Sequence, residues 1–413
     1  MPLNAKVVQF PNAFGSDYSL TGVGFQPKAG IFFGNAAVAG VTGQADMRPW
    51  IGLVGSAGTS DQVGGAYNST SAQPTSDCNA YQGAATIGAG ALMLADGTVT
   101  HNNDLETFDA DGLTAHLYGA SDFASHGLLL GGGDLKNAKT FSVALPTSSG
   151  SLSVTGIGFQ GDLVILFHSN IHASSTTYRS FCLGWATSPT NQGMTGVTIR
   201  DAQATMVGHR YQSNDECMAL FTNGGVVATV DLASFDADGL TFTVDNPLGQ
   251  DFTIYGMVIK GVTAQCGTFN ATGGSPDKAI TGVGFRPRAV LVMSNGNPSG
   301  SGVSTNAYLN VGAASSADTA EQFAITEGDR TAIADSDSQE STRSATFLLE
   351  RQYIKGWDDR VVATLTSLDA DGFSVNFSVA TRTSDDHLYL AIGDKPTVQI
   401  NGGSILGAKI AAA

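Results

Sequence analysis

Apolar and polar residues alternate along many short stretches of this chain. Residues 241–244 (Thr-Phe-Thr-Val) and 374–377 (Ser-Val-Asn-Phe) have the period of two that is typical of a strand with one solvated face. Residues 163–167 (Leu-Val-Ile-Leu-Phe) are continuously apolar, which predicts a central strand buried on both faces. No stretch keeps a helical period, although residues 317–323 are compatible with a short helix. The pattern therefore predicts an all-β protein.

Turn residues separate these strands at frequent intervals. Examples are Ala95-Asp96-Gly97 and residues 222–225 (Thr-Asn-Gly-Gly). The chain contains 52 glycines, and glycine readily adopts the positive φ angles that tight turns need. Many short strands joined by tight turns indicate two packed sheets in a sandwich that is jelly-roll-like or lectin-like in outline.

Four landmarks recur three times in the same order. They are a T-G-(V/I)-G-F segment, an apolar run, a glycine among small residues, and D-A-D-G followed by Leu or Phe. The T-G-(V/I)-G-F segments are residues 21–25, 155–159 and 281–285; the apolar runs are 29–33, 163–167 and 289–293; the glycines are Gly52, Gly184 and Gly312; the D-A-D-G segments begin at Asp109, Asp236 and Asp369.

The spacing of the landmarks is nearly constant. From the landmark phenylalanine to the first D-A-D-G aspartate there are 84, 77 and 84 residues, which indicates duplication. This period is too long for a solenoid repeat, so each copy is large enough for its own core. We therefore predict three tandem β-sandwich domains, at residues 1–135, 136–261 and 262–394, followed by a C-terminal extension at 395–413. These three units are called the first, second and third repeats below.

The repeated pattern resembles the modules of virion structural proteins in tailed bacteriophages, of the tail-fibre or decoration type. The resemblance is carried by T-G-V-G-F-Q-P-K with its apolar strand and by F-D-A-D-G-L with its closing strand, and it covers nearly the whole chain. It implies a structural protein of a virus particle, on the head, tail or fibre. The second repeat departs from the pattern because Gln160-Gly161-Asp162 lacks the proline of the other two, so we expect a different entry into its strand.

Charge excludes two classes of partner. The net charge is −16 and no cluster of Lys and Arg occurs, whereas nucleic acids and anionic membranes are bound by basic surfaces. The four cysteines show no paired spacing, which favours folding in a reducing cytoplasm without disulfides. No leader-like or membrane-spanning apolar segment is evident, so we expect assembly in the host cytoplasm.

The D-A-D-G segments are the strongest candidates for a cation site. Aspartates at i and i+2 before glycine match the start of an EF-hand loop, but position twelve is Ala120, Pro247 or Ala380 instead of glutamate. The EF-hand interpretation therefore fails. A structural turn with aspartate side chains on backbone N–H groups is the main prediction, and an unrelated cation site is the alternative.

Other candidate residues favour structural roles. His168 and His172 have the i, i+4 spacing of helical zinc ligands, but they follow a strand, so we expect them in a loop. The other histidines are expected on the surface or in packing: His101, His116, His126, His209 and His387. Trp185 follows a recurring glycine, but the equivalent residues are Leu53 and Ala313. A sugar site common to all three repeats is thus disfavoured, and Trp50, Trp185 and Trp357 are expected in packing.

Catalytic motifs are absent from the sequence. It contains no G-x-S-x-G elbow and no phosphate-binding G-x-x-x-x-G-K-(S/T) loop. Paired carboxylates at 215–216, 358–359 and 385–386 would suit glycoside hydrolysis only at a particular separation, and such pairs are usually solvated. We predict that the chain is not an enzyme, with no catalytic, cofactor-binding or metal-binding residues.

The sequence therefore predicts a non-enzymatic phage structural protein displayed on the particle. Expected partners are other virion proteins, further copies of the chain in a homo-oligomer, for which we favour a trimer, and a host surface glycan. Residues 397–406 could add a strand to a free sheet edge, so we expect the C-terminal extension to help docking. The alternatives are a soluble array of carbohydrate-binding modules and a glycan-degrading virion enzyme.

Overall fold

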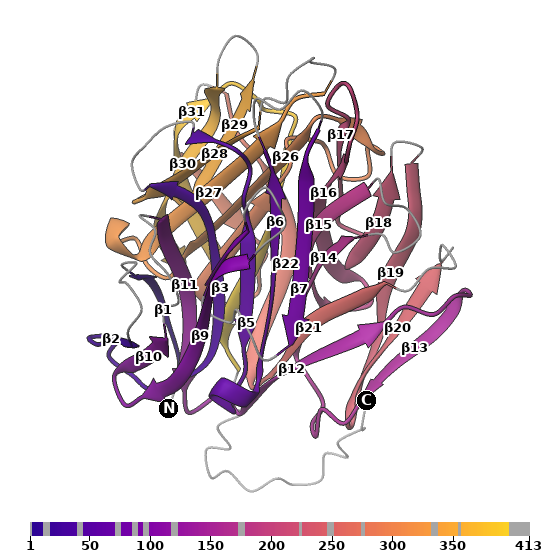
Figure 1. Cartoon of the computed structure of the whole chain (residues 1–413). Coiled ribbons are helices and arrows are strands. Elements are labelled where there is room, and N and C mark those ends of the chain that lie inside the picture. Colours follow the sequence, from indigo (N-terminus) through magenta and orange to yellow (C-terminus); the bar gives the residue numbers. More distant parts are fainter. Residues whose placement is uncertain are drawn as a thin grey trace, which may run out of the picture.

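The regular secondary structure of the computed structural model is almost entirely β-strand (Figure 1). It describes residues 2–10, 17–38, 44–70, 76–84, 90–93, 99–116, 123–171, 178–222, 225–245, 252–273, 277–331, 338–353 and 357–395. Within these ranges the helical elements are two short 3-10 turns, η1 (Gly58–Ser60) and η2 (Thr319–Glu321). The predicted all-β, sandwich-type fold is confirmed.

The first repeat forms a six-stranded sheet and a four-stranded sheet. The large sheet has the order β1-β11-β3-β5-β6-β7 and the small sheet the order β2-β10-β9-β8. The large sheet comprises β1 (Leu3–Phe10), β3 (Pro27–Val38), β5 (Trp50–Val54), β6 (Gln62–Ser69), β7 (Cys78–Ala84) and β11 (Phe123–Gly132); the small sheet comprises β2 (Asp17–Leu20), β8 (Gly90–Met93), β9 (Val99–Asp109) and β10 (Gly112–His116).

The second repeat has the same strand order. Its large sheet is β12-β21-β14-β15-β16-β17 and its small sheet is β13-β20-β19-β18. The strands are β12 (Asn137–Ala144), β13 (Gly150–Thr155), β14 (Leu163–Ile171), β15 (Tyr178–Ser188), β16 (Asn191–Arg200), β17 (Gly208–Ser213), β18 (Met218–Thr222), β19 (Gly225–Asp236), β20 (Gly239–Asp245) and β21 (Thr253–Lys260). β14 begins at Leu163, whereas β3 begins at Pro27, so the predicted difference in strand entry is confirmed.

The third repeat follows the same plan again. Its large sheet is β22-β32-β24-β26-β27-β28 and its small sheet is β23-β31-β30-β29. The strands are β22 (Val262–Asn270), β23 (Asp277–Thr281), β24 (Pro287–Ser294), β26 (Ala307–Ala314), β27 (Gln322–Asp329), β28 (Gln339–Ser344), β29 (Leu348–Tyr353), β30 (Trp357–Asp369), β31 (Gly372–Ala380) and β32 (Asp386–Asp394). The short helix expected at 317–323 is only the 3-10 turn η2, after which the chain enters β27.

Two short strands cross between repeats. β4 (Gln44–Ala45) of the first repeat extends the large sheet of the third by pairing with β28. β25 (Ser304–Thr305) of the third repeat extends the large sheet of the second by pairing with β17. Each follows its landmark phenylalanine by 19 residues, so the two exchanges are equivalent. They cover sheet edges that would otherwise expose unpaired backbone groups.

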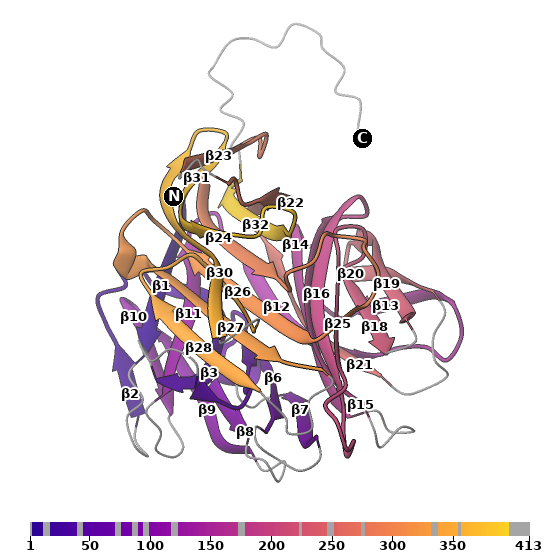
Figure 2. The ribbon, with the colours of Figure 1, turned by 90° about the horizontal axis from the view of Figure 1, so that it is seen from above.

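Each repeat has an apolar core between its two sheets, and a further core lies among all three large sheets. On β14, Val164 and Leu166 belong to the core of the second repeat, whereas Ile165 and Phe167 face the core shared with the other repeats. The same division occurs on β3 and β24. This explains why these strands are continuously apolar: one face packs inside the repeat and the other packs between repeats. Figure 2 shows the three groups of strands around a common centre.

The shared core was not predicted from the sequence. All strands of the large and small sheets lie within the predicted residue ranges, but β4 and β25 pair outside them. The repeats therefore contribute to one closed arrangement in addition to their own sandwiches. The boundaries of independently folding domains stay a prediction.

Candidate functional site

The second aspartate of each D-A-D-G turn holds the T-G-(V/I)-G-F segment of the same repeat. In the third repeat, Asp371 accepts hydrogen bonds from the backbone N–H of Gly282 at 3.1 Å and of Gly284 at 2.6 Å. Both glycines have φ near +83°, the left-handed region that favours glycine. The equivalent bonds join Asp111 to Gly22 and Gly24, and Asp238 to Gly156 and Gly158. Two of the recurring landmarks thus form one structural unit.

The first aspartate of each turn binds hydroxyl groups. Asp236 accepts from Ser234 Oγ and Thr241 Oγ1, both at 2.7 Å, and these bonds lower the pKa of its carboxyl. The equivalent bonds join Asp109 to Thr107 and Thr114, and Asp369 to Ser367 and Ser374. Among the described residues, no group of three potential ligands is placed to hold a metal ion. The predicted structural turn is confirmed in all three repeats.

A buried glutamine that sequence analysis missed recurs in every repeat. Gln322 forms a pair of bonds with the backbone of Leu365 on β30: its Nε2 donates to the carbonyl at 2.9 Å, and its Oε1 accepts from the N–H at 2.8 Å. Gln62 binds Leu105 in the same way, and Gln192 accepts from Leu232 N–H at 3.0 Å. These bonds tie the large sheet to the small one. The signal was present, because the glutamines follow the landmark phenylalanine by 37, 33 and 37 residues.

The residue before each glutamine connects its repeat to the next. Asp61 accepts from the backbone N–H and from the hydroxyl of Thr140 on β12, both at 2.7 Å. Asn191 exchanges two bonds with Cys266 on β22, accepting at 2.7 Å and donating at 2.9 Å. These side chains therefore cap the outer edge of the first strand of the following repeat.

The third repeat contacts the first, so the three repeats are joined in a closed ring. Glu321 accepts from Ser315 Oγ at 2.7 Å, and that hydroxyl accepts from Val7 N–H on β1 at 2.8 Å. Asp394, at the end of β32, accepts from Leu3 N–H at 2.7 Å. The start and the end of the described fold are thus in direct contact, and the three junctions use equivalent positions in cyclic order.

Charged side chains reinforce the junction between the first and third repeats. Arg48 donates from its guanidinium to Glu340 at 2.7 Å, and its backbone N–H lies 3.3 Å from Glu327 Oε2. Both glutamates are fully buried, and burial raises the pKa of Glu340 to about 7 and that of Glu327 well above its usual range. At the junction between the second and third repeats, Arg210 donates to Asn297 Oδ1 at 3.1 Å and lies 5.0 Å from the ring centroid of Tyr308.

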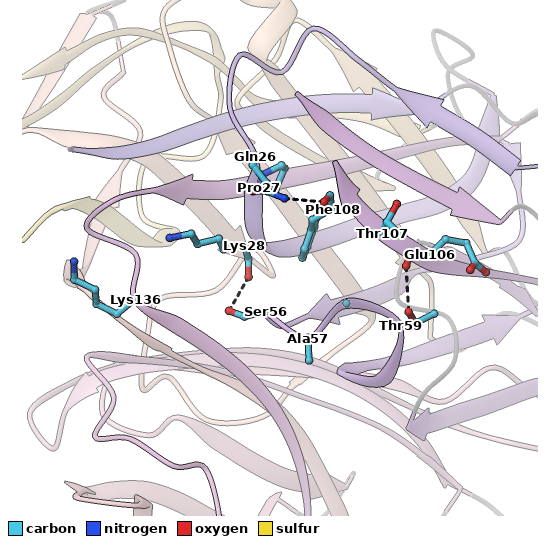
Figure 3. Close-up of a pocket in the computed structure, with 11 residues that line it drawn as sticks. Gln26, Pro27, Lys28, Ser56, Ala57, Thr59, Glu106, Thr107, Phe108 and Lys136 are labelled. Atoms are coloured by element: carbon cyan, nitrogen blue, oxygen red, sulfur yellow. Dashed lines mark hydrogen bonds between the residues drawn. The ribbon is translucent and has the colours of Figure 1, made fainter. Parts of the chain in front are cut away.

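Clefts open beside two of the junctions. One of them, which we call the first cleft, has a volume of about 580 Å³ and lies between the first repeat and the start of the second. Figure 3 shows Phe108 between Lys28 and Lys136 on one side and Glu106 on the other. A neighbouring cleft of about 520 Å³ contains Asp61, and a cleft of about 430 Å³ lies between the third and first repeats.

Hydrogen bonds fix the walls of the first cleft. Gln26 Nε2 donates to the carbonyl of Phe108 at 3.1 Å, and Thr59 Oγ1 donates to the carbonyl of Glu106 at 3.1 Å. Lys28 Nζ donates to the carbonyls of Gly132 and Leu135 at 3.0 and 3.1 Å. The cleft is therefore preformed and offers an aromatic ring, ammonium donors and a carboxylate acceptor.

The histidine and tryptophan candidates lie mainly in packing positions. His168 is buried inside β14, so its expected loop location is wrong, and His172 lies outside the described residues. Trp50 and Trp185 are buried, as predicted for packing, whereas the Trp357 side chain lies outside the described part. His126, His209 and His387 are also buried, and burial lowers the pKa of each imidazole. His116 pairs with Asp17 at 2.6 Å, and the side chain of His101 is not described.

The paired carboxylates bind neighbouring side chains or backbone groups. Asp359 pairs with Arg343 and Arg351 at 2.8 and 2.7 Å, and Asp385 pairs with Arg382 at 2.8 Å. Burial raises the pKa of Glu216, whose carboxylate oxygens lie 3.4 Å from the Tyr211 hydroxyl. All four cysteines are buried and free. These residues stabilise the fold. The predicted absence of enzymatic activity stays a prediction.

Comparisons with known proteins add little. No family model and no curated protein matches the chain. Among solved structures, OmpF from Salmonella typhi in complex with daunomycin is similar at 9% identity, covering 91% of this chain and 99% of that chain, with a TM-score of 0.12. This likeness supports no conclusion about fold or function. In the described part of the chain, no helix has the length and apolar character to cross a membrane.

Proposed function

We propose that the chain is a non-enzymatic structural protein displayed on the surface of a tailed bacteriophage particle, as a fibre, tail or head-decoration component. The proposal rests on the resemblance of its repeated motifs to virion modules and on the role of those motifs in the fold. The observation that carries it is that the recurring polar residues of all three repeats bind backbone groups or neighbouring strands. A repeated unit of this kind is suited to building a rigid particle component.

The closed arrangement supports a role in assembly. The junction residues Asp61, Asn191 and Glu321 join three similar units within one chain, so their relative positions are held by hydrogen bonds as well as by the shared core. One chain therefore offers three similar surfaces to neighbouring virion proteins, and multivalent contacts raise avidity without tight single contacts. Assembly in the host cytoplasm, a homotrimer and contact with a host surface glycan belong to the same proposal.

Electron microscopy of intact particles tests the proposal directly. Particles carrying a tagged copy of the chain should show the label at fixed, repeated positions on the head, tail or fibre. Purified particles without the label, while the protein stays free in the lysate, would contradict the proposal. Particles from a chain shortened after Lys395 test the docking role of the C-terminal extension, which lies outside the described residues apart from Lys395 itself; undiminished incorporation would count against that role.

A further inference from the structure

We propose that the first cleft binds a neutral oligosaccharide, with one hexose ring stacked on Phe108. The inference deepens the proposed function, because it rests on a displayed protein that meets a host surface glycan. It concerns a single junction and not a site repeated in every copy. Three features of the described residues carry it: the aromatic floor, the opposed polar walls, and the different chemistry of the equivalent cleft.

The floor of the cleft is a half-buried aromatic ring at the end of β9. Phe108 packs partly against the core of the first repeat, and its backbone carbonyl accepts from Gln26 Nε2 at 3.1 Å. The ring also lines the open cleft (Figure 3). An aromatic face attracts the C–H groups of a sugar ring, because its negative π-face meets their partial positive charge.

The walls provide both kinds of hydrogen-bonding partner. Two of the three N–H groups of the Lys28 ammonium donate to Gly132 and Leu135, so one N–H can still donate to a ligand. Lys136 is exposed and donates to the Gly133 carbonyl at 2.6 Å. The carboxylate of Glu106 on the opposite wall is exposed and accepts only. A sugar hydroxyl can accept from an ammonium and donate to a carboxylate, which suits a polyhydroxyl ring between these walls.

The charge of the protein selects a neutral sugar over an acidic one. The net charge is −16, and the exposed carboxylate of Glu106 lines the cleft opposite the two lysines. A polyanionic glycan would be repelled by this field, and a neutral one would not. The volume of about 580 Å³ lies within the range of ligand sites.

The equivalent cleft between the third and first repeats has different side chains. Leu368 occupies the position of Phe108, since each follows its landmark phenylalanine by 83 residues, and Arg286 replaces Gln26. The third-repeat wall of that cleft therefore has no aromatic ring at the position of Phe108, and the aromatic residue in its lining is Phe25 of the first repeat. The comparison also supplies a matched substitution: leucine is already accommodated at this position of the fold, so Phe108→Leu should remove the platform without unfolding the repeat.

Binding of the full chain to an array of neutral and acidic glycans tests the inference, followed by titration with the best neutral oligosaccharide. We expect saturable binding to neutral glycans, an affinity at least tenfold lower in Phe108→Leu, and a severalfold lower affinity in Glu106→Gln. The matched control Leu368→Phe should bind as the wild type does, and urea unfolding should show that every variant is folded. Absence of neutral-glycan binding, binding to acidic glycans alone, or unchanged affinity in Phe108→Leu would each overturn the inference.

The inference and the proposed function fail separately. A chain that is located on the particle but binds no neutral glycan retains its structural role and loses the cleft proposal. A chain that binds a neutral glycan through Phe108 but is absent from particles retains the cleft and loses the virion proposal. The microscopy and the glycan titration together therefore decide both.

Discussion

Replacement of Gln322 by leucine removes a pair of buried hydrogen bonds without removing much volume. Gln322 is 2% exposed, and its amide meets both backbone groups of Leu365, at 2.9 and 2.8 Å. Leucine cannot bond to either group, so the N–H and the carbonyl of Leu365 both lose their partner. Gln62 and Gln192 occupy the same position in the other repeats, which gives three tests of one prediction.

The expected cost follows from the number of groups left without a partner. A buried donor or acceptor without a partner costs about 1–3 kcal/mol, and part of this is recovered by the apolar contacts of leucine. We therefore expect Gln322→Leu to lower the free energy of unfolding by about 2–4 kcal/mol, with similar losses for Gln62→Leu and Gln192→Leu.

Urea unfolding followed by circular dichroism measures these losses. Gln9→Leu is the matched control, because Gln9 is exposed on β1 and the same substitution there should change the free energy of unfolding by less than about 0.5 kcal/mol. A loss below about 1 kcal/mol at all three buried positions would refute the reasoning that these bonds hold the small sheets in place.

Three further predictions test other parts of the fold. Burial raises the pKa of Glu340 to about 7 and of Glu350 to about 8, so the folded state binds more protons than the unfolded one. The melting temperature should therefore fall as pH rises from 6.5 to 9. Glu350→Gln should make this fall in melting temperature smaller. Gly239→Ala should cost about 1–3 kcal/mol, because its Cβ would lie 1.9 Å from Val154 O, whereas Gly193→Ala, with no neighbour nearer than 3.4 Å, should cost less. A circular permutant that joins residue 394 to Leu3 by a short linker and opens at residue 261 should give the wild-type circular dichroism spectrum, and an unfolded permutant would contradict the contact between Leu3 and Asp394.

Local patterns were sufficient to predict the class of the fold. The alternation at 241–244 and 374–377 corresponds to β20 and β31, and the D-A-D-G segments form the expected turns. Both signals are local: a strand shows its two faces at every second residue, and a turn needs its aspartate and glycine at fixed offsets. They are therefore readable without knowledge of the neighbouring repeats.

The arrangement of the repeats depends on information that is not local. A continuous apolar run such as 163–167 requires two covered faces, but it does not say whether the second cover comes from the same repeat or from another. The apolar run predicted two buried faces without showing what covers each of them, and in the structure Ile165 and Phe167 pack between repeats. The first cleft was missed for the same reason, because Gln26, Phe108 and Lys136 meet only after three segments converge.

Native-state hydrogen exchange in Leu291→Ala is the most direct test of the shared core. Leu291 on β24 is 1% exposed and packs among the three large sheets, and its truncation should cost about 2–5 kcal/mol. If the repeats fold around one common core, the free energy that protects the slowest-exchanging amides should fall by the same amount in β3, β14 and β24. Loss of protection in the third repeat alone would show that the repeats are independent and would contradict the account.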